Sequence, residues 1–311
     1  MKKHPRILLA IDGSERSFAA ARYMGKVISK KSTIVLFHVM REVPEAFSDL
    51  GADPLTENEN YPLTVWKTEQ EETIHEFMNV ARDILISSGF ANTAISVKIQ
   101  TLRSGVVRDI IGESMQDYSA LVVGRTGISK IEDITLGSVA AKLVEGISHL
   151  PVVVVGDRPD SQKILIALDG SKGSMKAVKC VGTLFDPAAC QLILCHVIRP
   201  LNTQQLSTKQ LFIHQHEANW INANQRKIVP VINEANRRLM DAGFSPESLA
   251  SEILTYQKSR AAAIAKAARD GGCDTIVLGR RGITSVENFA IGRVSRKILH
   301  FAYQPALWIV S

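Results

Sequence analysis

The sequence has no long apolar run. Its purely apolar stretches, such as Val152–Val155, are far shorter than the roughly 20 residues that a membrane-spanning helix needs. The basic N-terminus leads into only five apolar residues before Asp12, which is less than the apolar region of a signal peptide. We therefore expect a cytoplasmic protein with no membrane partner.

Paired cysteines are absent as well. The four cysteines lie in the second half of the chain and form no C-x-x-C pair: Cys180, Cys190, Cys195 and Cys273. Such scattered cysteines usually act as small hydrophobic residues, so we predict neither a redox site nor a metal site. His214, His216 and Glu217 have the side chains of metal ligands but no counterpart in the first half, and we predict no metal there.

Nucleic-acid-binding motifs are also missing, although the charge is unevenly divided. Residues 1–156 hold 17 Lys and Arg against 19 Asp and Glu, whereas residues 157–311 hold 20 against 12. A basic half can attract an anionic partner. Because no helix-turn-helix, zinc finger or RNA-binding signature accompanies the charge, a solvated basic face explains it better, and we expect no nucleic-acid partner.

An internal repeat is the main feature that the chain does contain. Residues 7–14 read ILLAIDGS and residues 164–171 read ILIALDGS, with six identities in eight positions. Residues 122–128 (VVGRTGI) and 277–283 (VLGRRGI) agree at five positions in seven. The same order at nearly the same offset indicates two copies of one domain.

The repeat sets the domain boundaries. The 311 residues are enough for two domains of about 150 residues, each with its own core. We place the first domain at 1–156 and the second at 163–311, joined by a polar linker at 157–162.

Each copy alternates strands with helices. In the first copy we expect strands at Arg6–Ile11, Thr33–Val39, Ile95–Thr101, Ala120–Val123 and Val152–Val155. Helices are expected from the N-cap Ser14 to Lys30, then up to Ser88, at Ser104–Gln116 and at Gly137–Gly146. The second copy repeats this pattern and ends in a strand at Pro305–Val310. Strands that alternate with long helices form a parallel sheet covered on both faces, so we predict two tandem, doubly wound, five-stranded α/β domains of Rossmann-like type.

A glycine-rich loop follows the fourth strand of each copy. Two glycines three positions apart are followed, after nine further residues, by a third: Gly124, Gly127 and Gly137 in the first copy, Gly279, Gly282 and Gly292 in the second. Ligands of doubly wound folds bind at the carboxyl ends of the strands, and glycines there can adopt a positive φ and let the backbone approach a phosphate. A helix that begins at the third glycine directs free N–H groups to the same place. The spacing is neither the Walker nor the classical dinucleotide pattern.

This arrangement resembles the universal stress protein family over essentially the whole chain. ATP-binding members of that family carry G-x2-G-x9-G-[ST] after the fourth strand, an aspartate at the end of the first strand and a valine after the second. The matching residues here are Asp12, Val39, Gly124, Gly127, Gly137 and Ser138, and in the second copy Asp169, Val197, Gly279, Gly282 and Gly292. The neighbouring Arg125, Val139, Arg280, Arg293 and Ser295 complete the candidate nucleotide contacts. The resemblance implies a tandem member with the adenine nucleotide α-hydrolase-like fold that binds ATP with Mg²⁺.

Each matched residue has an alternative role. Asp12 and Asp169 could accept from ribose hydroxyls or hold a phosphate-bound Mg²⁺, or they could only start the turn of D-G-S. Val39 and Val197 could line the adenine, or they could be plain core residues. His38 and His196 are expected in the core or at its rim rather than as ligands.

The copies depart from the family pattern at the start of the last helix. The family places one hydroxyl directly after the third glycine and another two positions later. The first copy keeps Ser138 but has Ala140, whereas the second has Arg293 and keeps Ser295. Arg293 could fork onto a phosphate or narrow the pocket. We therefore favour ATP in the first domain, and the second could bind ATP or a different anion.

Catalytic motifs are missing. The sequence shows no general base placed by a motif, no paired carboxylates, no nucleophile elbow and no S-G-G-x-D-S loop of the ATP pyrophosphatases. A phosphate cradle without a residue that positions water gives little acceleration. We expect an ATP-binding regulatory stress-response protein rather than an enzyme. The alternatives are a scaffold or chaperone-like module with one or both sites empty, and a slow ATPase.

Partners follow from the resemblance. Single-copy members pair through their last strands, which implies that Val152–Val155 and Ala306–Val310 pair within this chain as an internal pseudo-dimer and protect two sheet edges. The tandem chain could also form a homodimer. Residues 40–62 and 199–212 differ between the copies, and we expect them to recognise a protein partner.

Overall fold

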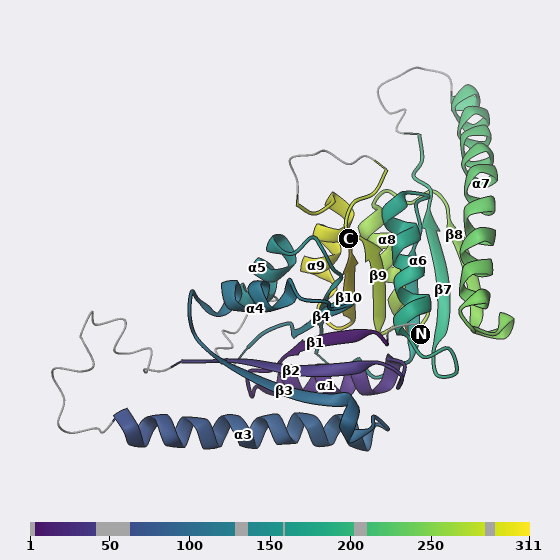
Figure 1. Cartoon of the computed structure of the whole chain (residues 1–311). Helices are drawn as coiled ribbons and strands as arrows, with labels where there is room; N and C mark the ends of the chain where they lie inside the picture. Colours follow the sequence, from purple (N-terminus) through teal and green to yellow (C-terminus); the bar gives the residue numbers. More distant parts are fainter. Residues whose placement is uncertain (1–3, 42–62, 128–135, 158, 202–209, 284–289) are drawn as a thin grey trace.

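The computed structural model describes residues 4–41, 63–127, 136–157, 159–201, 210–283 and 290–311 (Figure 1). At residues 63–65 and 210–215 it describes the backbone alone. Most of the two segments expected to recognise a partner, 40–62 and 199–212, lies outside the described residues.

One continuous sheet of ten strands runs through the described part of both copies. The first copy supplies β1 (Arg6–Ala10), β2 (Thr33–Met40), β3 (Ile95–Thr101), β4 (Ala120–Gly124) and β5 (Val152–Val155). The second supplies β6 (Lys163–Ala167), β7 (Gln191–Val197), β8 (Leu249–Leu254), β9 (Thr275–Gly279) and β10 (Ala306–Val310). The order is β3-β2-β1-β4-β5-β10-β9-β6-β7-β8, with parallel pairing inside each copy. The two predicted doubly wound, five-stranded domains are confirmed.

The helices follow the same repeat. They are α1 (Glu15–Val27), α3 (Leu63–Ser87), α4 (Val106–Ser114) and α5 (Ser138–Gly146), then α6 (Lys172–Leu184), α7 (Gln210–Asp241), α8 (Arg260–Asp270) and α9 (Arg293–Phe301). Short 3-10 turns at Asn92–Ala94 and Pro246–Ser248 precede β3 and β8. None of the helices in the described ranges combines the length and the apolar character that a bilayer span needs.

Helix α1 begins as the sequence predicts and ends earlier. The Ser14 side chain caps it by accepting from the backbone N–H of Ser17. The predicted end at Lys30 is wrong, because Ile28 is already extended and forms an antiparallel bridge with Phe185 of the second copy. Contact between the copies therefore decides where this helix stops.

Both faces of the sheet are buried, because alternate residues of each strand point to opposite sides. On β1, Ile7 and Leu9 belong to one apolar core and Leu8 to the other. The first core packs under α1, α3, α6 and α7, and the second under α4, α5, α8 and α9. Each core crosses from one copy into the other, so the two domains form a single three-layered body (Figure 1).

The copies join through their last strands. β5 and β10 pair in antiparallel fashion with Val153 opposite Trp308, which confirms the predicted internal pseudo-dimer. The Trp308 ring is fully buried and tilts against Phe185 with 4.7 Å between the ring centroids. Its Nε1–H donates to the Tyr23 hydroxyl at 2.8 Å, and that hydroxyl lies 3.0 Å from Thr275 Oγ1. Every polar group of this apolar contact thus has a partner.

Candidate functional site

The candidate site of each domain lies where two neighbouring parallel strands end. β1 pairs with β4 and β6 pairs with β9, so the residues that follow these strands meet at one edge of the sheet. A Cβ atom on Gly127 would lie 2.8 Å from Oδ2 of Asp12, and one on Gly282 would lie 2.5 Å from Oδ2 of Asp169. The structure thus brings the predicted aspartate and the second glycine together in both domains.

Both aspartates also organise the turn in which they lie. Asp12 Oδ1 accepts from the Ser14 backbone N–H at 3.0 Å and from the Ser14 hydroxyl at 2.5 Å. Asp169 Oδ1 accepts from the Ser171 N–H at 2.9 Å. The turn role that the sequence left open is therefore real, and it fixes one carboxylate oxygen while the other faces the glycine loop.

The glycines of the two loops are needed for close approach and not for a left-handed conformation. Glycine makes a positive φ available at these positions, but none of the six uses it: Gly124, Gly127, Gly137, Gly279, Gly282 and Gly292. A Cβ on Gly124 would lie 3.0 Å from the backbone of Arg16 in α1, and one on Gly279 would lie 2.6 Å from the backbone of Gly173 in α6. At Gly137 and Gly292 an added Cβ would lie 3.2 Å from the carbonyl oxygens of Arg125 and Arg280 in their own loops. Close contacts, rather than a left-handed turn, therefore explain the glycines.

The third glycine starts the helix that points at the loop. Gly137 and Gly292 are the N-caps of α5 and α9, with no side chain capping either helix. Their own N–H groups donate to the carbonyls of Arg125 and Arg280, at 2.9 and 2.8 Å. The first-turn N–H groups of a helix have no partner inside it, so these two starts offer donors and a positive dipole end beside the glycine loop.

The residues after the third glycine differ in placement. Ser138, Val139 and Arg293 are exposed at the helix starts. Ser295 is buried, and its hydroxyl donates to the Gly279 carbonyl at 2.9 Å. Ser295 therefore braces the glycine loop of the second domain instead of pointing at a ligand, and Ala140 fills this place in the first.

Arg125 and Arg280, predicted as nucleotide contacts, point into the contact between the domains. Only 1% of Arg125 and 4% of Arg280 is exposed. Arg125 Nη2 donates to the carbonyl of Leu299 in α9, and Arg280 Nη2 donates to those of Val144 and Ile147 at the end of α5. The identical arginine in the two copies signalled a shared role, but a single sequence gave no sign that its acceptors lie in the opposite domain.

The valines and histidines near the site belong to the core or its edge. Val39 and Val197 are buried in the core under α4 and α8. The Nδ1 atoms of His38 and His196 lie 2.7 Å from the carbonyls of Ile11 and Leu168. Burial lowers the pKa of both imidazoles, so each is held neutral and donates to the residue before the candidate aspartate. The expectation of core or rim histidines is confirmed.

The cysteines behave as apolar residues. All four are buried thiols, and burial raises the pKa of Cys180, Cys190 and Cys195 to about 12 and that of Cys273 to about 11. The described residues contain no cluster of three or more potential metal ligands. The His214 side chain lies outside the described residues.

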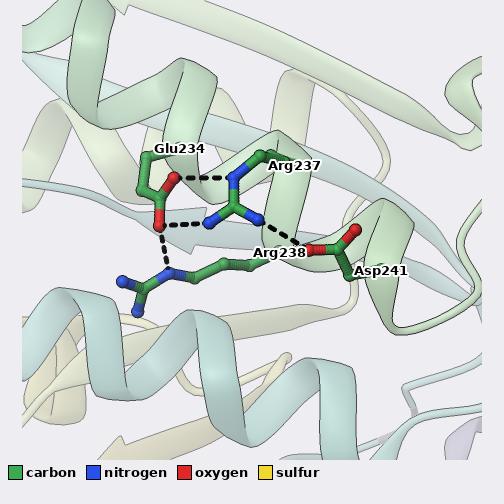
Figure 2. Close-up of polar contacts among 4 residues, drawn as sticks. All are labelled: Glu234, Arg237, Arg238 and Asp241. Carbon is green, nitrogen blue, oxygen red and sulfur yellow. Dashed lines mark hydrogen bonds and ion pairs between the residues drawn. The ribbon is translucent and has the colours of Figure 1, made fainter.

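The basic surplus of the second domain is partly paired on its surface. On α7, Arg237 contacts Glu234 at 2.8 Å and Asp241 at 2.8 Å, and Arg238 contacts Glu234 at 2.7 Å (Figure 2). Such exposed pairs contribute little to stability. Helix α9 instead carries exposed Arg293, Arg296 and Lys297 and no acidic residue in its sequence RVSRKILHF, so cationic charge gathers on the helix that begins at the second site.

The fold and the site define a class of protein: tandem α/β domains with one glycine-loop site each, at the carboxyl ends of their strands. The model of the universal stress protein family matches residues 4–156 and again residues 161–309. The chain therefore belongs to the universal stress protein family and carries two of its domains in tandem.

Known relatives agree with this assignment. The universal stress protein YxiE of Bacillus subtilis is 26% identical over 153 residues, which cover 47% of this chain and 96% of that protein. A universal stress protein of Mycolicibacterium smegmatis is 26% identical over 231 residues, 69% of this chain and 74% of its own length. The crystal structure of a universal stress protein from Archaeoglobus fulgidus has a similar fold, with a TM-score of 0.57 at 20% identity over 98% of both chains.

Proposed function

We propose that this chain binds ATP with Mg²⁺, more tightly in the first domain than in the second, and acts as a nucleotide-dependent regulatory protein of the stress response. In this proposal the protein has no efficient catalysis. A cytoplasmic location and recognition of a protein partner remain predictions from the sequence.

One observation carries the proposal: in both domains an aspartate carboxylate faces a glycine loop too close to it for any side chain. A carboxylate beside bare backbone suits a ligand with both hydroxyls and phosphates. Asp12 would accept from the ribose or hold the phosphate-bound metal ion. The backbone at Gly127 and the first turn of α5 would donate to phosphate oxygens, and a bound Mg²⁺ would neutralise phosphate charge.

The first domain offers the better site. Ser138 adds an exposed hydroxyl directly at the start of α5, where it can donate to a phosphate oxygen. In the second domain Arg293, which has no hydroxyl, takes this place.

The absence of efficient hydrolysis rests on the placement of the site residues. The candidate aspartates hold their own turns, and the imidazoles of His38 and His196 are fixed on backbone carbonyls. None of these groups is arranged as the base that orients an attacking water. A scaffold with an empty second site is the second candidate, favoured by Arg293 in the place of the Ser138 hydroxyl.

Calorimetry of nucleotide-free protein with ATP and Mg²⁺ tests the proposal, using Gly127→Asp and Gly282→Asp. Either aspartate would crowd the existing carboxylate and place negative charge where phosphate binds. We expect Gly127→Asp to remove the tighter site and Gly282→Asp to remove only a weaker one.

Gly112→Asp is the matched control, because Gly112 is an exposed residue of α4 whose added Cβ would meet nothing within 4 Å. It should bind like the wild type. Absence of ATP binding by the wild-type protein would overturn the proposal and leave the scaffold.

A further inference from the structure

The two buried arginines of the glycine loops form reciprocal links between the domains. The Arg125 guanidinium reaches the carbonyl of Leu299, in the last turn of α9. The Arg280 guanidinium reaches the carbonyls of Val144 and Ile147, at the end of α5. Each arginine thus caps the C-terminal end of the helix whose N-terminal end faces the site of the opposite domain.

The backbone of the same arginines is fixed inside their own site. The Arg125 N–H donates to Val155 at the end of β5, and its carbonyl accepts from the Gly137 N–H that starts α5. Arg280 repeats both bonds with Val310 and Gly292. Arg125 therefore connects the first glycine loop to the end of α9, and α9 leads to the second glycine loop. Arg280 connects the second loop to the end of α5, which leads back to the first loop.

We propose that Arg125 and Arg280 are positioning residues that couple the two sites, each holding the helix that begins at the site of the other domain. This inference rests on the proposed nucleotide binding at those sites. It assigns to the arginines a role in affinity that acts across the domain boundary.

Helices α5 and α9 can transmit a displacement from one end to the other. At 1.5 Å per residue, the nine residues of α5 or α9 span roughly 14 Å and move as one stiff unit. The last carbonyls of a helix have no partner within it, and a cation there is favoured by the helix dipole. Any shift of the arginine at one end therefore moves the N–H groups that meet the ligand at the other end.

Burial makes the arginines hard to displace. Removal from water lowers the pKa of both guanidinium groups to about 10, so both stay charged near neutral pH. Arg280 is further held by Ser311 Oγ at 2.9 Å and by the Ala290 carbonyl at 3.1 Å. A buried charge that leaves its acceptors loses far more than an exposed one.

The links predict the sign of the coupling. A phosphate that orders one glycine loop also fixes its arginine, and with it the helix of the opposite site in its binding position. Occupancy of either site should therefore raise the affinity of the other, by the same factor in both directions.

Hydrogen exchange followed by mass spectrometry reads each site separately in the full chain. Peptides covering 137–146 and 292–301 report on α5 and α9, and titration with ATP and Mg²⁺ gives a midpoint of protection for each. Arg280→Lys keeps the positive charge but loses the planar guanidinium that donates to several carbonyls at once. We expect it to raise the ATP midpoint of α5, in the other domain, by about five-fold or more. Arg125→Lys should do the same to α9, which provides a second variant if one does not fold.

Arg269→Lys is the matched control, because Arg269 is an exposed arginine in the last turn of α8, and both midpoints should stay at the wild-type value. An unchanged α5 midpoint in Arg280→Lys, with ATP still protecting the helix, would overturn the coupling and leave nucleotide binding intact. If ATP protects neither helix of the wild type, nucleotide binding itself fails. Exchange without ligand then still decides whether the arginine positions α5: faster α5 exchange in Arg280→Lys supports it, and unchanged exchange refutes it.

Discussion

The two domains share a backbone plan but differ in the side chains at equivalent positions. At the start of the site helix, Ser138 of the first domain corresponds to Arg293 of the second; two residues later, Ala140 corresponds to the buried Ser295. These differences show that a repeated site can keep its backbone arrangement while the side chains at the start of its helix diverge.

The contact between the domains differs in the same way. Val153 of β5 faces Trp308 of β10. Outside these strands, Ile28 bridges to Phe185. The bulky member of both pairs comes from the second domain. The first domain contributes Tyr23, whose hydroxyl accepts a hydrogen bond from Nε1–H of Trp308.

The largest effect should come from removing the bulky half of this contact. Trp308→Ala empties a fully buried site and leaves the Tyr23 hydroxyl without its donor. We expect a loss of about 3–5 kcal/mol in the free energy of unfolding, measured by denaturant titration. Val153→Ala, directly opposite, should cost roughly 1–2 kcal/mol. If the two variants lose the same free energy of unfolding, Trp308 stabilises the contact no more than Val153 does, and the prediction is wrong.

A smaller effect is expected at the start of α9. Arg293→Ser gives the second site the side chain of the first, and in a Gly127→Asp background only the second site remains to be measured. We expect ATP to bind about 2- to 5-fold more tightly, because the shorter side chain opens the site and its hydroxyl can donate to a phosphate oxygen, a gain of ~0.5–1 kcal/mol for one hydrogen bond. Calorimetry at two salt concentrations should also show a weaker salt dependence. Weaker binding would instead mean that the Arg293 guanidinium itself contacts a phosphate, and Arg269→Ser controls for the lost charge.

The smallest effect concerns the histidines, which the domains share. Burial lowers the pKa of His38 and His196 in the folded state, so the unfolded chain binds more protons as the pH falls toward and below about 6.5. The free energy of unfolding should therefore be complete above that pH and decline below it. His38→Asn with His196→Asn should flatten the decline between about pH 7.5 and 5.5.

Each single histidine variant should account for part of that change, because both imidazoles make the same bond. The exposed His300→Asn is the control. A pH dependence carried by His300 alone, or by neither core histidine, would contradict the prediction.

Much of the fold could be predicted from the sequence, because the same pattern of strands and helices occurs in both copies. The strands at Ile95–Thr101 and Val152–Val155 end where the sequence predicts, since apolar runs between turn residues mark a buried strand. The end of α1 could not be predicted, because the bridge from Ile28 to Phe185 joins residues distant in sequence. Local patterns identify an element, and contacts between domains decide its last residues.

The site shows the same division. The meeting of Asp12 with Gly127 follows from the rule that ligand-binding residues gather at strand ends. The direction of Arg125 and Arg280 could not be foreseen, because an arginine beside a phosphate-type loop is an ordinary anion ligand. Only the paired strands β5 and β10 bring the carbonyls of the opposite helix within reach of these side chains.

The unequal pairs between the domains also decide which copies can associate. Two first domains from separate chains would set valine against valine and isoleucine against isoleucine, and a void would remain where Trp308 and Phe185 now pack. Two second domains would force two indoles and two phenyl rings into the same space. Both mispaired forms are penalised, so the contact selects a first domain against a second domain over either pair of like domains.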